Sequence, residues 1–178
     1  MLLHALFAAL PGVDPSDRQR AGEAYLRRRG VSEADAKLLL AEVQQVLGDH
    51  SFAPLFDCNS RAEVPISVRL PELGNVELSG QIDRLVVTDD FVLIADFKTN
   101  REAPATVEEI PKLYRVQMAL YRAALQKIYP GKRVDCALIW TDSARLMSIP
   151  AETLDAEMQS LVEKTASISD TQAQLDRK

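Results

Sequence analysis

"VLIADFKTN", residues 92–100, begins as an apolar strand and ends in charged and polar side chains. Alternate residues of a strand point to opposite faces, so Asp96 and Lys98 share one face with Ile94. Both faces are apolar up to Ala95, which is typical of a central strand. Charged groups do not enter a core without a partner. The stretch therefore indicates either a structural ion pair at a strand end or a functional site.

The preceding stretch, "NVELSGQIDRLVV" at residues 75–87, predicts a second strand joined to the first by a tight turn at 88–90. Alternation places Gln81, Asp83, Leu85 and Val87 on one face. A two-residue turn would pair the strands so that Asp83 faces Asp96, whereas a loop of odd length would shift the register by one. Two opposed carboxylates repel each other. Protonation of one acid, a cation between them or a different register would relieve the repulsion.

A divalent cation is the simplest of these remedies, because carboxylate oxygens suit magnesium, manganese or calcium. Lys98 alone cannot neutralise two acids. A lysine beside a metal site can orient or deprotonate a water molecule and stabilise developing negative charge. Two acids, a metal and a lysine form the minimum set of groups for phosphodiester hydrolysis.

The rest of the chain predicts one domain over residues 1–170 and a flexible tail over 171–178. Helical periodicity covers 1–48, a loop covers 51–62, and 63–150 forms an α/β core, followed by a closing helix over 151–166. Pro65 places its strand near a sheet edge. Thr106 and Glu109 match a capping box that would open the long helix, with Pro111 at its first position or at a kink.

Composition says more about the cellular compartment of the protein than about its activity. The 178 residues carry a net charge of −5, which counts against a nucleic-acid binder without excluding one. Cys58 and Cys136 lack zinc-type spacing and are too few for a four-thiolate iron–sulfur cluster, so a reduced, cytoplasmic compartment is expected. The first ten residues are interpreted as an amphipathic helix, and no apolar run reaches the roughly 20 residues needed to span a membrane.

The long helix places Tyr114, Gln117 and Tyr121 on one face. An amide between two tyrosines can hydrogen-bond a phosphate or a base edge, and the rings can stack on unpaired bases. Ordinary packing of the three side chains against the sheet remains an alternative. The basic run at 18–29 likewise fits a solvated helix face or a contact with a DNA backbone.

"GQIDRL", "IADFKTN" and "QMALY", in this order, resemble the motifs of the RecB-type branch of the PD-(D/E)XK nucleases. More narrowly, residues 1–150 resemble the C-terminal nuclease domains of the AddA family of bacterial helicase–nucleases. The resemblance implies a restriction-endonuclease-like α/β core, in which helices flank a mixed central sheet, with a helical segment at the N-terminus. The three motifs in order and at this spacing are far more specific than the Asp-x-Lys tripeptide alone.

The resemblance also implies roles for individual residues. Asp83 and Asp96 would hold magnesium, or manganese in its place, together with the backbone carbonyl of Phe97, and Lys98 would be the catalytic lysine. The remaining assignments are His4 as an upstream metal ligand, Gln117 and Tyr121 with neighbouring Tyr114 along the DNA path, and Glu63 as a possible auxiliary acid on the first strand.

The implied function is magnesium-dependent exonuclease cleavage of DNA, preferably single-stranded, in double-strand break repair by recombination. The implied partners are DNA, a helicase portion of the same polypeptide that these 178 residues do not include, and an AddB-like subunit. No membrane and no iron–sulfur cluster are expected. The alternatives are a non-catalytic module of the same fold that binds DNA or docks a subunit, and a domain that is inert until joined to its helicase.

Overall fold

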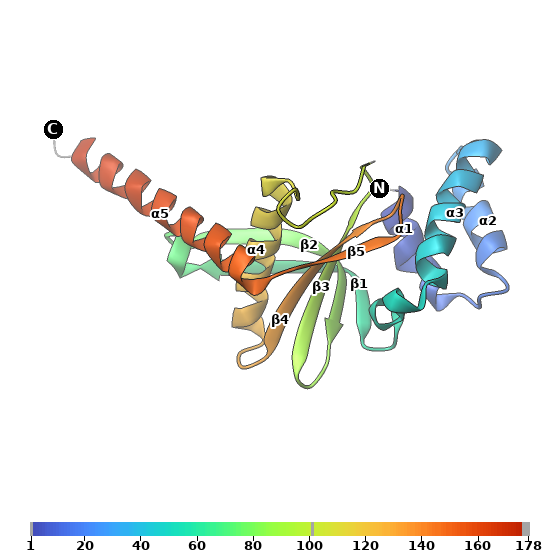
Figure 1. Ribbon diagram of the computed structural model, residues 1–178, viewed down its shortest axis with the longest axis horizontal. Helices are drawn as coiled ribbons and strands as arrows, with labels where there is room; N and C mark the ends of the chain where they lie inside the picture. The colour runs from blue at the N-terminus through green and yellow to red at the C-terminus, as the bar shows by residue number, and fades with distance from the viewer. Residues whose placement is uncertain (1, 101, 176–178) are drawn as a thin grey trace.

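A five-stranded mixed sheet forms the centre of the protein, whose computed structural model describes residues 2–100 and 102–175 (Figure 1). The spatial order of the strands follows the chain, and only the β3–β4 pair is parallel. Pro65 lies on the edge strand, as predicted. The strands are β1 Ser60–Leu70, β2 Val76–Val87, β3 Phe91–Lys98, β4 Arg133–Trp140 and β5 Arg145–Ile149.

Two helical layers cover the sheet and create two cores (Figure 1). One core lies under α4, where Met118 and Leu125 meet Ile94 of β3. The other lies under α1 to α3, where Phe7 and Leu40 pack with Phe97 of the same strand. The helices are α1 Leu2–Ala9, α2 Arg18–Arg28, α3 Glu33–Gly48, α4 Lys112–Ile128 and α5 Ala151–Leu175. The predicted α/β fold with an N-terminal helical segment is confirmed.

The hairpin between β2 and β3 has the predicted register. Thr88 closes the turn by donating its amide to the Phe91 carbonyl at 3.0 Å and by accepting the Phe91 amide on its hydroxyl at 3.1 Å. Arg84 then pairs with Ala95, which extrapolates to Asp83 opposite Asp96. The regular pairing ends at Arg84, so the two strands continue past this point without a ladder between them.

Strict alternation along β2 fails at Asp83. Ile82 and Leu85 both belong to the core under α4, although residues three apart in a regular strand face opposite sides. Glu63 of β1 lies between two register pairs that flank Asp83, and it has a φ of +53° in the left-handed region. This left-handed residue twists the edge of the sheet locally. The predicted common face for Gln81, Asp83 and Leu85 is therefore wrong.

Two predicted boundaries also differ from the structure. Residues His50–Phe56 form a 3-10 helix rather than loop, because Asp49 caps its first turn and Phe52 is buried. The long helix begins at Lys112 rather than at Thr106. Pro111, with a ψ of 133°, is its N-cap. Glu109 instead accepts the Ala105 amide at 2.7 Å within the preceding turn.

The closing helix is longer than predicted. α5 runs to Leu175, although the prediction ended it at residue 166 and began a flexible tail at 171. Residues 151–175 contain no glycine or proline to break the helix. Its first turns pack through Leu154, and its later turns extend away from the sheet (Figure 1). Residues 176–178 of the predicted tail lie outside the described residues.

Within the described ranges, no helix combines the length and the apolar character needed to cross a bilayer.

Replacing Phe7 by alanine tests whether the helical segment and the sheet form one cooperative unit. Phe7 is fully buried and stacks on Phe97 with ring centroids 4.2 Å apart. We expect Phe7→Ala to lower the free energy of unfolding by about 3–5 kcal/mol. Circular dichroism and the fluorescence of Trp140, in the other core, should report the same lower denaturation midpoint. The exposed control Leu38→Ala should stay within about 0.5 kcal/mol. An unshifted fluorescence transition would show two independent units.

Candidate active site

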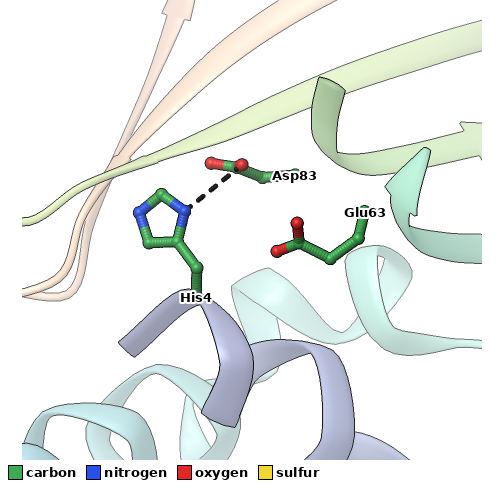
Figure 2. Close-up of side chains that lie close together, drawn as sticks. All are labelled: His4, Glu63 and Asp83. Atoms are coloured by element: carbon green, nitrogen blue, oxygen red, sulfur yellow. Dashed lines mark ion pairs between the residues drawn. The ribbon is translucent and has the colours of Figure 1, made fainter. Parts of the chain in front are cut away.

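His4 and Phe97 hold the Asp83 carboxylate where β2 and β3 separate. One carboxylate oxygen lies 3.3 Å from Nδ1 of His4, which comes from α1 (Figure 2). The other oxygen accepts the backbone amide of Phe97 at 2.8 Å. This side-chain bond replaces a ladder bond at the first position where the strands are no longer paired. Asp83 is consequently fixed at the opening between the strands.

Glu63 joins the same group from the edge strand. Ligand atoms of His4, Glu63 and Asp83 all lie within 4.8 Å of one another, and Figure 2 shows the three side chains converging from α1, β1 and β2. Glu63 also accepts a hydrogen bond from the Gln81 amide. Two carboxylates and an imidazole at this spacing are a suitable donor set for a divalent cation.

Asp96 and Lys98 form a buried ion pair beside this group. Lys98 Nζ lies 2.6 Å from an Asp96 carboxylate oxygen, and the two residues are only 8% and 5% exposed. The Lys98 ammonium also sits 3.9 Å from the centroid of the Tyr114 ring. The shared face predicted for these two residues by alternation is thus the face toward α4.

Gln117 of α4 contacts both members of this ion pair. Its amide nitrogen donates to Asp96 at 3.2 Å, and its amide oxygen accepts from Lys98 Nζ at 3.1 Å. One turn further, the Tyr121 hydroxyl donates to the Gln81 carbonyl at 3.1 Å. The Tyr114 hydroxyl donates to Asn100 at 3.3 Å. The predicted face of α4 is therefore turned toward the site.

The two aspartates are not arranged side by side on one face as predicted. Asp83 contacts His4 on the α1 side and lies in the opening between the strands, whereas Asp96 contacts Gln117 on the α4 side. The difference coincides with the break in alternation along β2 at Asp83, beside the left-handed Glu63 of β1. The group that the structure gathers is His4, Glu63 and Asp83, with the Asp96–Lys98 pair next to it.

The Asp83 carboxylate affects the pKa values of two neighbours, Asp96 and His4. Burial raises the pKa of Asp96, and the negative charge of Asp83 raises it further against the opposing effect of Lys98. The hydrogen bond to Asp83 raises the pKa of His4 above its ordinary value of 6.5. Both residues therefore hold protons more tightly than usual, and a bound cation would compete with those protons.

Arg84 is a supporting residue that sequence reasoning missed. It is only 5% exposed, donates to the Phe7 carbonyl and to the Ser60 hydroxyl at 3.3 Å, and lies over the Phe56 ring. It thereby fastens α1 to β2 one residue from Asp83. The signal was its position within an apolar run, which indicates a buried guanidinium rather than a surface charge.

Comparison with known proteins places this geometry in a family. A family model described as the PD-(D/E)XK nuclease superfamily matches residues 1–177. The chain belongs to the PD-(D/E)XK nuclease superfamily. It also resembles the crystal structure of a presumed exonuclease from Eubacterium rectale, with a TM-score of 0.61 over 94% of this chain and 65% of that one. At 12% identity, this likeness shows the shared fold alone.

Curated relatives confirm the narrower resemblance. An ATP-dependent helicase/nuclease subunit from Streptococcus suis (strain 98HAH33) is 37% identical over 73 residues, which is 40% of this chain. The protein of the same name from Streptococcus pyogenes serotype M2 (strain MGAS10270) is 27% identical over 133 residues, or 71% of this chain. These alignments span 6% and 11% of the relatives' own lengths. This PD-(D/E)XK chain therefore corresponds to a small part of them.

The raised pKa of His4 predicts a pH-dependent stability of the metal-free protein. The protonated imidazole stabilises the fold fully below its unfolded pKa of 6.5, and this contribution is lost as the pH rises through the higher folded pKa. Chemical denaturation in a chelating buffer should therefore show the free energy of unfolding falling from about pH 5.5 to 8.5. His4→Ala should remove this part of the pH dependence. His50→Ala, which alters an exposed histidine, is the matched control. An unchanged slope in His4→Ala would contradict the assignment.

Proposed function

We propose that this PD-(D/E)XK chain is a magnesium-dependent DNA nuclease domain that hydrolyses phosphodiester bonds. The observation that carries the proposal is the buried Asp96–Lys98 pair, 2.6 Å apart, next to Asp83 and His4. Keeping two acids and a lysine dehydrated at a strand opening is costly for a protein that needs only stability. The cost is explained if the groups act on a phosphate.

The donor atoms fit a divalent cation of the magnesium or manganese type. His4, Glu63 and Asp83 lie close enough together to hold it, and Asp96 and the carbonyl of Phe97 would complete the site from β3. Glu63 and Asp83 bring two negative charges to one point, and the Lys98 charge is already engaged by Asp96. A bound cation would supply an activated water and neutralise charge on the phosphate oxygens.

Lys98 would contribute the remaining electrostatic step. Its ammonium is held by Asp96, Gln117 and the Tyr114 ring, so it is orientated before substrate arrives. Water attacks the phosphorus atom, the bond to the leaving oxygen breaks, and negative charge develops on the phosphoryl oxygens. A fixed positive charge near those oxygens stabilises the transition state more than the ground state.

The names of the relatives support a substrate and a setting for this proposal. We propose that the domain is fed with single-stranded DNA by a helicase portion of the same polypeptide, and that its partner is an AddB-like subunit, in bacterial double-strand break repair by recombination. The matched proteins are named helicase/nuclease subunits, and the family is a nuclease family. A net charge of −5 suits a domain that receives DNA from a neighbour rather than capturing it alone.

A magnesium titration of cleavage on single- and double-stranded DNA tests the proposal. We expect Asp83→Ala, Asp96→Ala and Lys98→Ala each to reduce cleavage at least about 100-fold, because each removes charge stabilisation at the phosphate. Asp89→Ala and Lys37→Ala, which change exposed residues of the same types, are matched controls. Thermal denaturation of every variant checks that the fold is kept.

Two outcomes would contradict the assignment in different ways. Full activity of Lys98→Ala would exclude the assigned role of the lysine. Retention of DNA without cleavage at every magnesium and manganese concentration, even after the helicase portion is joined, would favour the non-catalytic binding or docking module.

A further inference from the structure

We propose that Gln117 and Tyr121 are positioning residues, which brace the two ligand-bearing strands at a fixed separation rather than lining a path for DNA. The inference rests on the proposed function, because it treats Asp83 of β2 and Asp96 of β3 as metal ligands. It replaces the DNA-contact role that the family resemblance implies for the same two side chains.

The strands need such a brace at this position. The last register pair between β2 and β3 is Arg84 with Ala95, so the aspartates lie just beyond the end of the ladder. Both carboxylates are buried, and two like charges in a region of low dielectric constant repel each other. The bond from the Phe97 amide to Asp83 crosses the opening here. A second element is required to fix the distance between the carboxylates.

Gln117 holds the β3 side of the opening. One N–H of its amide donates to Asp96 at 3.2 Å, and its amide oxygen accepts from Lys98 Nζ at 3.1 Å. Using both ends of the amide fixes its orientation, because a flipped amide would oppose donor to donor at Lys98. One N–H and the oxygen of the amide are thereby engaged by the two charged groups that it orientates.

Tyr121 holds the β2 side. Its hydroxyl donates to the Gln81 carbonyl, two residues before Asp83, and its ring lies against Gly80. A Cβ atom added at Gly80 would lie 2.8 Å from both the Cε1 atom and the hydroxyl oxygen of Tyr121, so the strand and this side chain are in direct contact. Tyr121 is only 7% exposed, and its ring face cannot stack on a base without leaving this contact.

α4 supplies the rigidity of the brace. Positions four apart on a helix lie on one face and about 6 Å apart along its axis. The helix is itself anchored, because Arg115 donates to Glu157 of α5 at 2.9 Å. One helix face therefore links β2 and β3 at the point where their own hydrogen bonding has ended.

Manganese binding to the DNA-free protein, followed by electron paramagnetic resonance, tests the brace. We expect Gln117→Ala to weaken binding about 10-fold or more, as loss of a residue supporting metal ligands typically does. Tyr121→Phe, which removes one hydrogen bond and keeps the ring, should weaken it about fivefold. Gly80→Ala should act in the same direction by pressing on the ring from the strand side. Tyr25→Phe and Gln159→Ala, both on helices away from the site, should bind like the wild type.

Cleavage kinetics provide the second readout. For Tyr121→Phe and Gln117→Ala we expect kcat to fall while KM for DNA stays unchanged, because the variants disturb ligand geometry and not DNA contact. Wild-type manganese affinity in both variants, combined with a raised KM, would overturn the brace and restore the DNA-path role. Failure of the wild-type protein to bind manganese would overturn the metal site of the proposed function and, with it, this proposal.

Discussion

The hydrogen bond from the Phe97 amide to the Asp83 carboxylate is the contact on which the site depends. It forms where the ladder between β2 and β3 stops, so a side chain takes over from the backbone as the link between strands. Phe97 is also the residue whose ring stacks on Phe7 of α1. One residue thus connects the central strand, the acid on the neighbouring strand and the helix that carries His4.

The site therefore combines residues from both sides of the sheet. Asp96 and Lys98 extend from β3 into the α4 side, and His4 reaches Asp83 from the α1 side. The buried Arg84 fastens α1 to β2 through the Phe7 carbonyl, next to Asp83. Such a site requires the whole domain to be folded, since no single helix–strand unit contains all of its groups.

Much of this could be predicted because it depends on local rules. Alternation correctly placed Asp96 with Lys98, the short turn fixed the register of the hairpin, and Pro65 indicated an edge strand. The errors arose where tertiary structure overrides such rules. The left-handed Glu63 breaks the alternation at Asp83, and nothing in the sequence alone shows a positive φ at a glutamate. The burial of Arg84 and Tyr121 depends on contacts with distant segments, which periodicity does not reveal.

The only tryptophan of the chain occupies an informative position. Trp140 ends β4 in register with Lys98, and its ring centroid lies 6.0 Å from that of Tyr114, the ring beneath the Lys98 ammonium. Its indole nitrogen is buried and has no hydrogen-bond partner among the described residues. An indole in a dry, fixed environment responds to changes in nearby charge. The fluorescence of Trp140 should therefore report changes in charge at Lys98, from which it is separated by the Tyr114 ring.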